Sequence, residues 1–350
     1  MKTKSKSQIT NNSSLELFGL IDNTEEVNSC ELTNKNGIQL KVINYGATIT
    51  SLKIPLKNGE VVDVVLGFDT LENYIKSFDL DGAPYFGATI GRFAGRINNS
   101  IFNLNGKTIH LNKNNNNHSL HGGNDCFSKK IWKVKNVKNG KNPSITLSYF
   151  SPDGEENYPG DLSVELTYTL SEDNELIIEY VARTSKDTVI NLTHHSYFNL
   201  DGHDATILEQ ELTIDSFGIL ETDAQNIPTG KLLSLENKPF DFSHAKKCPQ
   251  TIDTTFVLNQ SETENASLFS SKNNLEMLVY TNQPGVHIYV GGNCFNAIKG
   301  KENADYNSLS GICFETQNFP DAPNHKHFPN AVLKKGEEYQ HKTSYKFQNR

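Results

Sequence analysis

Leu162 to Leu170 reads Leu-Ser-Val-Glu-Leu-Thr-Tyr-Thr-Leu, with apolar and polar residues alternating at every step. Successive side chains of an extended strand point to opposite faces, so the five apolar side chains of this stretch share one face. Ser171 to Asn174 then turns the chain back into a second run, Leu176–Arg183. This pattern predicts two half-buried antiparallel strands and excludes a helix here.

Further short β-type runs, separated by Gly, Asn and Asp turns, lie on both sides of this pair: Val27–Leu32, Ile38–Ile43, Ala47–Ile54, Val61–Phe68, Ile101–Leu104, Lys107–Leu111, Thr206–Ile214, Met277–Thr281, Val286–Gly291, Gly311–Glu315 and Ser344–Phe347. Asn105-Gly106 marks the tightest hairpin. Thr70 to Lys76 is expected to form one or two helical turns capped by Thr70. Ser261 to Asn274 is expected to be a polar excursion between strands. The chain is therefore predicted to be all-β, a sandwich or a barrel.

The composition of the chain argues against several classes of protein. No Pro/Ser linker or composition break divides residues 15–350, which we expect to form one domain after a disordered tail, residues 1–14. A net charge of −8 argues against a nucleic-acid partner. No apolar run approaches the roughly 20 residues of a membrane helix, and the first residues lack a signal-peptide core. Five scattered cysteines without a Cys-x-x-Cys pair predict neither a zinc ribbon nor a disulfide framework, so we expect a cytoplasmic protein.

The segment from Asn191 to Leu200 contains two adjacent histidines, His194 and His195, next to Tyr197. Neighbours in an extended chain face opposite sides, so only one of the two can enter a pocket. An imidazole there can give or take a proton near neutral pH, whereas a structural histidine would only hydrogen-bond. The aromatic and amide residues that follow are typical of sugar pockets.

Three other stretches are rich in polar and turn residues. Gly91 to Asn98 carries Arg92 and Arg96, which we expect to share a face, either at the surface or with one guanidinium binding sugar oxygens. His121 precedes two glycines, where a ligand can approach the backbone closely. Glu315 ends an apolar strand, so its carboxylate is either paired or functional.

Six stretches in order resemble the aldose 1-epimerases (galactose mutarotases): Gly91–Ile97, Ser119–Gly123, Asp153–Asp161, Leu192–Leu200, Gln283–Val286 and Glu315–Pro323. The resemblance covers nearly the whole chain after the tail. It implies a large antiparallel β-sandwich of the galactose-mutarotase type, with a cleft on one sheet, an aldohexose substrate, and neither a cofactor nor a metal.

Carried over residue by residue, the resemblance places the general acid at His195 and the general base at Glu315. Sugar binding falls to Gly95, Arg96, His121, Ser196, Tyr197, Asp253 and Gln283. Three positions depart from the family pattern. Many relatives carry Asn at the positions of Gly95 and His194, and the binding aspartate usually stands in an Asp-His-x-Phe setting, whereas this chain reads Asp253-Thr254-Thr255-Phe256.

Exchanging anomers requires the O1 hydroxyl to lose a proton while the ring oxygen gains one, which asks for one base and one acid. Reference pKa values of about 4.3 and 6.5 suit a carboxylate and an imidazolium near neutrality. We expect the carboxylate of Glu315 to favour the charged form of His195 further.

Three alternatives remain at this stage: a non-catalytic carbohydrate-binding sandwich, a hexose-phosphate epimerase that uses Arg92, and a metal site built from His121, His194, His195 and Glu315. The sequence alone predicts a monomer or weak dimer.

Overall fold

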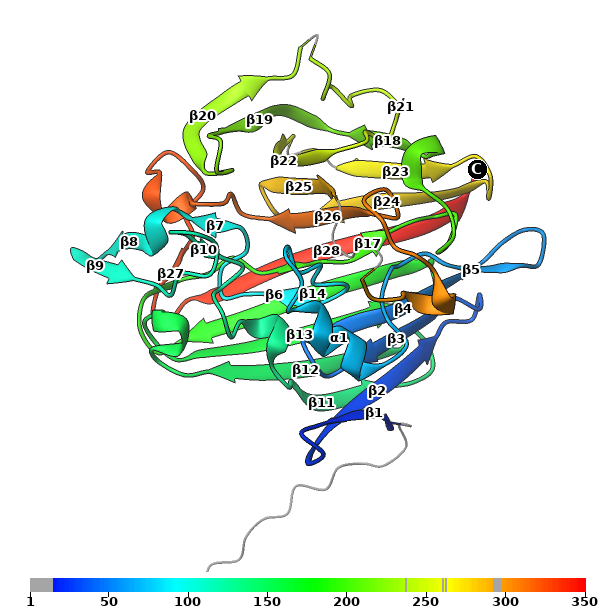
Figure 1. Ribbon diagram of the computed structural model, residues 1–350, viewed down its shortest axis with the longest axis horizontal. Helices are drawn as coiled ribbons and strands as arrows, with labels where there is room; N and C mark the ends of the chain where they lie inside the picture. The colour runs from blue at the N-terminus through cyan, green and yellow to red at the C-terminus, as the bar shows by residue number, and fades with distance from the viewer. Residues whose placement is uncertain (1–14, 237, 260, 262, 292–296) are drawn as a thin grey trace, which may run out of the picture.

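The computed structural model describes residues 15–236, 238–259, 261, 263–291 and 297–350, and antiparallel sheets are its main elements (Figure 1). The tail predicted for residues 1–14 lies outside the described residues, and the division into one domain stays a prediction. The alternating stretch forms strand β13 (Leu162–Leu170), with its apolar residues buried as predicted. It pairs along its whole length with β14 (Glu175–Thr184).

The largest sheet has nine strands, and the long C-terminal strand runs through its middle (Figure 1). In spatial order the strands are β11 (Lys133–Lys138), β12 (Ser144–Ser151), β13, β14, β28 (Glu338–Asn349), β24 (Leu275–Thr281), β23 (Ala266–Ser270), β18 (Glu211–Ile214) and β21 (Lys246–Lys247).

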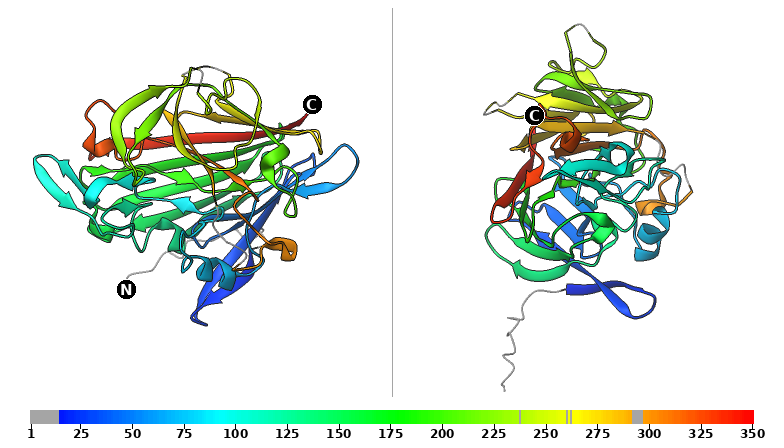
Figure 2. Two further views of the ribbon diagram at one scale, coloured as in Figure 1. Left: turned by 45° about the horizontal axis from the view of Figure 1, so that its top comes forward. Right: turned by 90° about the vertical axis from the view of Figure 1, so that its left-hand side faces the viewer.

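Two further sheets are large. The six-stranded sheet has the order β17 (Tyr197–Phe198), β26 (Ile312–Gln317), β25 (Gly285–Val290), β22 (Ile252–Leu258), β19 (Ser216–Thr222) and β20 (Pro228–Ser234). The five-stranded sheet runs in sequence order through β1 (Leu15–Ile21), β2 (Glu25–Thr33), β3 (Gln39–Ile43), β4 (Thr48–Pro55) and β5 (Val61–Asp63). The β1–β2 hairpin projects from one end of the molecule (Figure 2).

Shorter elements connect these sheets. Two-stranded pairs join β6 (Thr89–Ile90) to β16 (Thr193–His194), β7 (Arg96–Ile97) to β10 (Ser119–Leu120), β8 (Ile101–Leu104) to β9 (Lys107–His110), and β15 (Thr188–Val189) to β27 (Val332–Leu333). Single 3₁₀ turns occupy Asn98–Ser100, Phe127–Lys129, Glu155–Asn157, Ile207–Glu209, Lys301–Asn303 and Ala322–Asn324. Helix α1 (Leu71–Ser77) begins where expected, because Thr70 Oγ1 accepts a hydrogen bond from the backbone N–H of Asn73.

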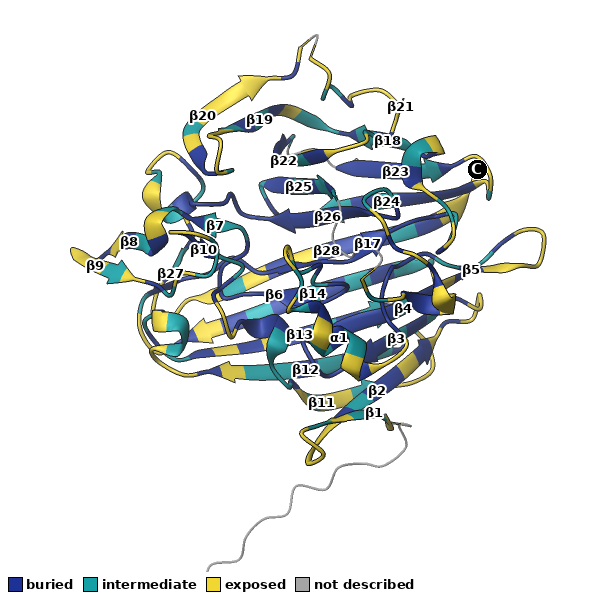
Figure 3. Cartoon of the chain, in the orientation of Figure 1, coloured by how far each residue is buried: buried dark blue, intermediate teal, exposed yellow. Residues whose placement is uncertain are grey.

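The nine-stranded sheet packs against both other large sheets, as the burial of the strand interiors shows (Figure 3). The aromatic rings of Phe198 on β17 and Tyr345 on β28 lie 4.9 Å apart between their centroids. Tyr345 also donates a hydrogen bond to the carbonyl of Phe314 on β26, and Tyr168 donates one to the carbonyl of Ala47. The hydroxyls of Tyr345 and Tyr168 therefore each have a backbone partner outside their own sheet, which helps to fix how the layers stack. The predicted sandwich is confirmed.

Two sequence-based expectations were wrong. The run Thr206–Ile214 is a 3₁₀ turn over Ile207–Glu209 followed by a strand of four residues, β18. The excursion Ser261–Asn274 contains a strand, β23, that is mostly buried. The hydrophobic pattern did not predict this strand because two of its buried residues are polar. Ser267 and Ser270 are buried, and they form hydrogen bonds with Thr213 and Asp201, respectively.

Candidate active site

A cavity of about 610 Å³ opens over the six-stranded sheet and collects most of the predicted site residues. Strands β22, β25 and β26 supply its floor. Loops before and after β7 and β10 supply its walls. The cavity is lined by Gly95, Arg96, His121, His195, Tyr197, Asp253 and Glu315. Its size lies within the roughly 300–1,000 Å³ typical of small-molecule sites.

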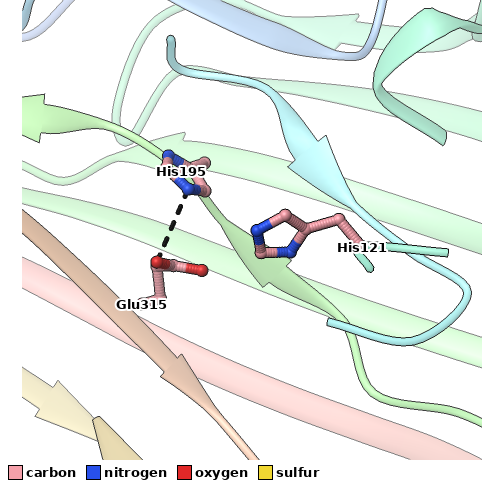
Figure 4. A group of neighbouring side chains, drawn as sticks. All are labelled: His121, His195 and Glu315. Atoms are coloured by element: carbon pink, nitrogen blue, oxygen red, sulfur yellow. Dashed lines mark ion pairs between the residues drawn. The ribbon is translucent and has the colours of Figure 1, made fainter. Parts of the chain in front are cut away.

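His195 and Glu315 meet at the bottom of this cavity (Figure 4). His195 Nε2 lies 3.5 Å from Glu315 Oε1, and both side chains are almost wholly buried. His195 follows the short strand β16, whereas Glu315 belongs to β26, so residues 120 positions apart in the sequence face one another. A proton donor and a proton acceptor are thus placed side by side in a site with little water.

The surroundings of His195 depress its basicity. The rings of Tyr85, Tyr197 and His121 lie 5.3–5.8 Å from the ring of His195 between centroids, and Cys313 Sγ lies 3.7 Å from its Nδ1. Burial lowers the pKa of His195 and outweighs the raising effect of the Glu315 charge. The carboxylate of Glu315 does favour the charged form of His195, as expected, but burial has the larger effect.

His194 points away from the cavity, as the strand alternation predicted. Its ring packs edge-on against Tyr168, at 5.8 Å between centroids, in the core between the sheets. Burial lowers the pKa of His194 to about 3, so its imidazole is neutral. His194 is a core residue, and the pair of histidines divides into one site residue and one packing residue.

Gly95 and His121 are linked through the backbone. The N–H of Gly95 donates a hydrogen bond of 3.3 Å to His121 Nδ1, and Gly95 has a φ of +79°, in the left-handed region that glycine tolerates. Burial holds the pKa of His121 well below its usual value, so the ring is neutral. Because Nδ1 accepts the amide proton, the proton of the neutral ring resides on Nε2, which then acts as a donor.

The same tautomer bears on metal binding. Ligand atoms of His121, His195 and Glu315 lie within 4.8 Å of one another. A metal ligand needs an unprotonated ring nitrogen, and the His121 nitrogen that is free of the Gly95 N–H carries the proton. The donor set therefore suits hydrogen bonding to a polar substrate better than it suits a metal ion.

Arg92 and Arg96 separate, contrary to the expectation that they share a face. Arg92 is buried and donates hydrogen bonds to Ser151 and to the carbonyls of Pro152 and Gly160, away from the cavity. Arg96 lines the cavity and donates a hydrogen bond from Nε to Asn115 Oδ1 at 3.1 Å. The chain bends at Gly95, so the alternation of an extended strand does not hold between the two arginines.

Asp253 belongs to a network that the sequence did not reveal. Its Oδ1 lies 2.8 Å from His287 Nε2, and its Oδ2 accepts a hydrogen bond of 2.8 Å from Asn226. His287 Nδ1 lies 2.8 Å from Thr255 Oγ1. All four residues line the cavity. Asp253 thus lines the cavity, and its histidine partner comes from the neighbouring strand β25.

The geometry places His195, Glu315 and a cavity of small-molecule size together, and comparison with known proteins identifies the family. The family model for aldose 1-epimerase matches residues 28–346. The chain belongs to the aldose 1-epimerase family. It is 40% identical over 321 residues to the galactose mutarotase of Bos taurus, covering 89% of this chain and 91% of the relative. It is 34% identical over 336 residues to the aldose 1-epimerase of Haemophilus influenzae, covering 90% and 94%.

Solved structures in this family have the same fold. An aldose epimerase homologue from C. elegans superimposes with a TM-score of 0.85 at 32% identity, covering 92% of this chain and 99% of the other. A galactose 1-epimerase from Lactobacillus acidophilus superimposes with a TM-score of 0.83 at 25% identity, covering 97% and 99%.

Two predicted sugar-binding residues of this aldose 1-epimerase do not reach the cavity. Ser196 lies between two cavity-lining residues, His195 and Tyr197, so strand alternation turns it to the opposite, buried side. Gln283 lies in the turn between β24 and β25 and donates a hydrogen bond to Asn282. The glutamine that lines the cavity is Gln317 on β26. It lies two residues after Glu315, and the period of two could have found it.

Proposed function

We propose that this aldose 1-epimerase interconverts the α and β anomers of aldohexoses such as D-galactose and D-glucose by acid- and base-catalysed ring opening. The observation that carries the proposal is the distance of 3.5 Å between His195 Nε2 and Glu315 Oε1 at the bottom of the cavity. A proton donor and a proton acceptor so close together can serve O1 and the ring oxygen of one sugar.

The reaction needs only proton transfers. Glu315 as carboxylate takes the proton of the O1 hydroxyl, while His195 as imidazolium protonates the ring oxygen and the bond between C1 and that oxygen breaks. Rotation about the C1–C2 bond presents the other face of the aldehyde, and the reverse transfers close the ring. Burial makes the imidazolium of His195 a stronger acid, since it lowers the pKa of the ring.

The remaining cavity residues would hold the sugar. Arg96 and the Nε2–H of His121 can donate to the oxygen on which charge develops. Asp253 and Gln317 can bind more distant hydroxyl groups, and Tyr197 offers an apolar ring surface. These roles rest on position in the cavity and on the family pattern.

A binding protein without catalysis is the second reading, and it predicts no acceleration of mutarotation. A hexose-phosphate epimerase is the third. Arg92 cannot serve it, because its guanidinium is buried elsewhere, but Lys129 lines the cavity together with Arg96. Hexose 6-phosphates therefore belong in the substrate panel.

Location and assembly are proposals as well. No helix among the described residues is long and apolar enough to cross a membrane. Four cysteines, Cys30, Cys126, Cys248 and Cys313, are buried and unpaired, which supports a reducing, cytoplasmic setting. Cys294 lies outside the described residues. We propose a monomer or a weak dimer, which size-exclusion chromatography with light scattering tests.

Polarimetry tests the central proposal. Freshly dissolved α-D-galactose and α-D-glucose should approach their equilibrium rotation faster when the purified protein is added, in proportion to its concentration. An unchanged rate with both sugars and with hexose 6-phosphates would refute the proposed activity and favour the binding-only reading.

A further inference from the structure

His287 lies between two carboxylates on the floor of the cavity. In the sheet register, His287 on β25 stands directly opposite Thr255 on one side and directly opposite Glu315 on the other. Directly opposed residues place their Cβ atoms about 4.5–5.5 Å apart on the same face of a sheet. The side chains of Thr255, His287 and Glu315 thus form a row across three strands, and all three line the cavity.

The hydrogen bonds of His287 suit the doubly protonated ring. Nε2 lies 2.8 Å from a carboxylate oxygen of Asp253, and Nδ1 lies 2.8 Å from the hydroxyl oxygen of Thr255. Both partners can accept a proton, so both ring nitrogens can donate at once. Asp253 is itself fixed by Asn226 on its other oxygen, which holds the imidazole in one orientation.

The charged groups around His287 also favour its cation. Asp253 and Glu315 face it from β22 and β26, Arg96 faces it from β7, and His121 and His195 lie across the cavity. Burial alone would lower the pKa of His287, but the hydrogen bond and charge of Asp253 and the charge of Glu315 outweigh burial and the opposing charge of Arg96, so the pKa is raised. The pKa values of His121 and His195 are lowered.

We propose that His287 is the positioning residue that holds a positive charge beside Glu315, so that Glu315 can act as the base. This rests on the proposed mutarotase mechanism. In this arrangement Asp253 has two roles: it binds the sugar, and it accepts the hydrogen bond that orients the imidazolium of His287. The physical reason is that a buried carboxylate needs a nearby positive charge to stay deprotonated, and burial makes His195 a poor source of it.

The decisive variant is His287→Gln, which keeps a side-chain donor but cannot carry a charge. We expect the rising, acid-side limb of kcat/KM against pH to move to higher pH by roughly one unit or more, because the variant lacks the positive charge beside the catalytic carboxylate. The rate on the plateau above that limb should change little. His327→Gln, on an exposed loop, is the matched control and should leave the profile in place.

A second measurement does not depend on activity. The ring ¹⁵N shifts of His287, assigned by their loss in His287→Gln, should show an imidazolium at pH 7 in the wild type. Coupling between two sites is reciprocal, so Glu315→Gln should lower the pKa of His287 by as much as His287→Gln raises the pKa on the acid limb.

Two results would overturn the inference. One is a His287 pKa that does not respond to Glu315→Gln. The other is a His287→Gln profile that falls by the same factor at every pH, as a purely structural role requires. If the wild type fails to accelerate mutarotation, the proposed activity fails, while the NMR titration still measures the coupling of the two side chains. The NMR titration also decides the question if His287→Gln does not fold.

Discussion

At the scale of single residues, the adjacent histidines His194 and His195 lie in different surroundings. One ring faces the cavity and Glu315, and the other faces Tyr168 in the core. Adjacent residues therefore have opposite surroundings because a strand alternates its side chains.

Removing the acid, His195, or the base, Glu315, should greatly lower kcat. Glu315→Gln keeps the size of the side chain but cannot accept the O1 proton, and His195→Asn cannot supply an acidic proton. Each should lower kcat by about 10² to 10⁴-fold, measured by polarimetry, with unchanged far-UV circular dichroism. The double variant should lose less than the product of the two single losses, because the two residues act in one exchange.

The rate of the wild type should be bell-shaped in pH. The rising limb follows deprotonation of Glu315, and the falling limb follows deprotonation of His195. His194→Asn is the control and should change kcat far less than His195→Asn. If His194→Asn were the damaging change and His195→Asn the mild one, the assignment of the acid would be wrong.

Asp253→Ala should act mainly on binding. In the proposed mechanism the carboxylate binds a hydroxyl that takes no part in the proton transfers, so the contact is kept from the ground state to the transition state, and its loss raises KM with little change in kcat. The measurement belongs at the pH plateau, where Glu315 is ionised regardless of its neighbours. A collapse of kcat with an unchanged KM would assign Asp253 to the chemical step.

Removing metal ions should leave the activity unchanged, because every proposed step is a proton transfer between side chains and sugar. The protein is incubated with EDTA, desalted and assayed by polarimetry. Loss of activity that zinc restores would instead make His121, His195 and Glu315 a metal site.

At the scale of elements, the segment from Gly91 to Ile97 joins the cavity to the nine-stranded sheet. Arg92 ties it to the connection between β12 and β13, and Arg96 projects from the same segment into the cavity. The bend between them depends on Gly95, where an added Cβ would lie 2.8 Å from the side chain of Pro320 in addition to the strain of a positive φ.

The two arginines should respond differently to lysine. Arg92→Lys loses several buried hydrogen bonds of the guanidinium fork and should lower the free energy of unfolding by roughly 2 to 4 kcal/mol, with little effect on kcat/KM of the folded protein. Arg96→Lys should keep the stability and raise KM. Urea denaturation and polarimetry measure the two effects. Equal effects of both changes on KM would contradict the separation seen in the structure.

At the scale of the whole molecule, the protein keeps several histidines neutral inside. Burial lowers the pKa values of His194 and His341 to about 3 and holds the pKa of His121 well below its usual value. An unfolded chain binds protons on these rings near pH 6.5, whereas the folded protein does not.

Stability should therefore fall as the pH drops below about 6.5, because the unfolded state then binds more protons than the folded state. Each such histidine contributes up to about 1.4 kcal/mol per pH unit between its unfolded and folded pKa values. Urea denaturation at pH 7.5, 6 and 5 measures this slope, and His194→Asn should reduce it. A free energy of unfolding that stays constant from pH 7.5 to 5 would refute the assignment.

The sequence by itself determined the sheet architecture and the chemistry-bearing positions. The alternation of Leu162–Leu170 and the turn signals depend on local geometry, which a sequence pattern records directly. Four of the six family motifs contain the cavity-lining His195, Glu315, Arg96 and His121, since each motif is a short local pattern. Asp253 came from a separate match outside the six motifs.

Only the tertiary structure decided which residues meet across strands and what their surroundings do. Strand pairing brought His287 between Asp253 and Glu315, although the sequence marked only the motif Gln283–Val286 directly before it and not His287 itself. Because the chain bends at Gly95, Arg92 bonds the connection between β12 and β13, whereas Arg96 lines the cavity. Gln283 lies in the turn before β25 and does not line the cavity, whereas Gln317 does. Burial also decided the net pKa direction of His195, because desolvation depends on the enclosing chain as a whole and outweighs the neighbouring charge of Glu315.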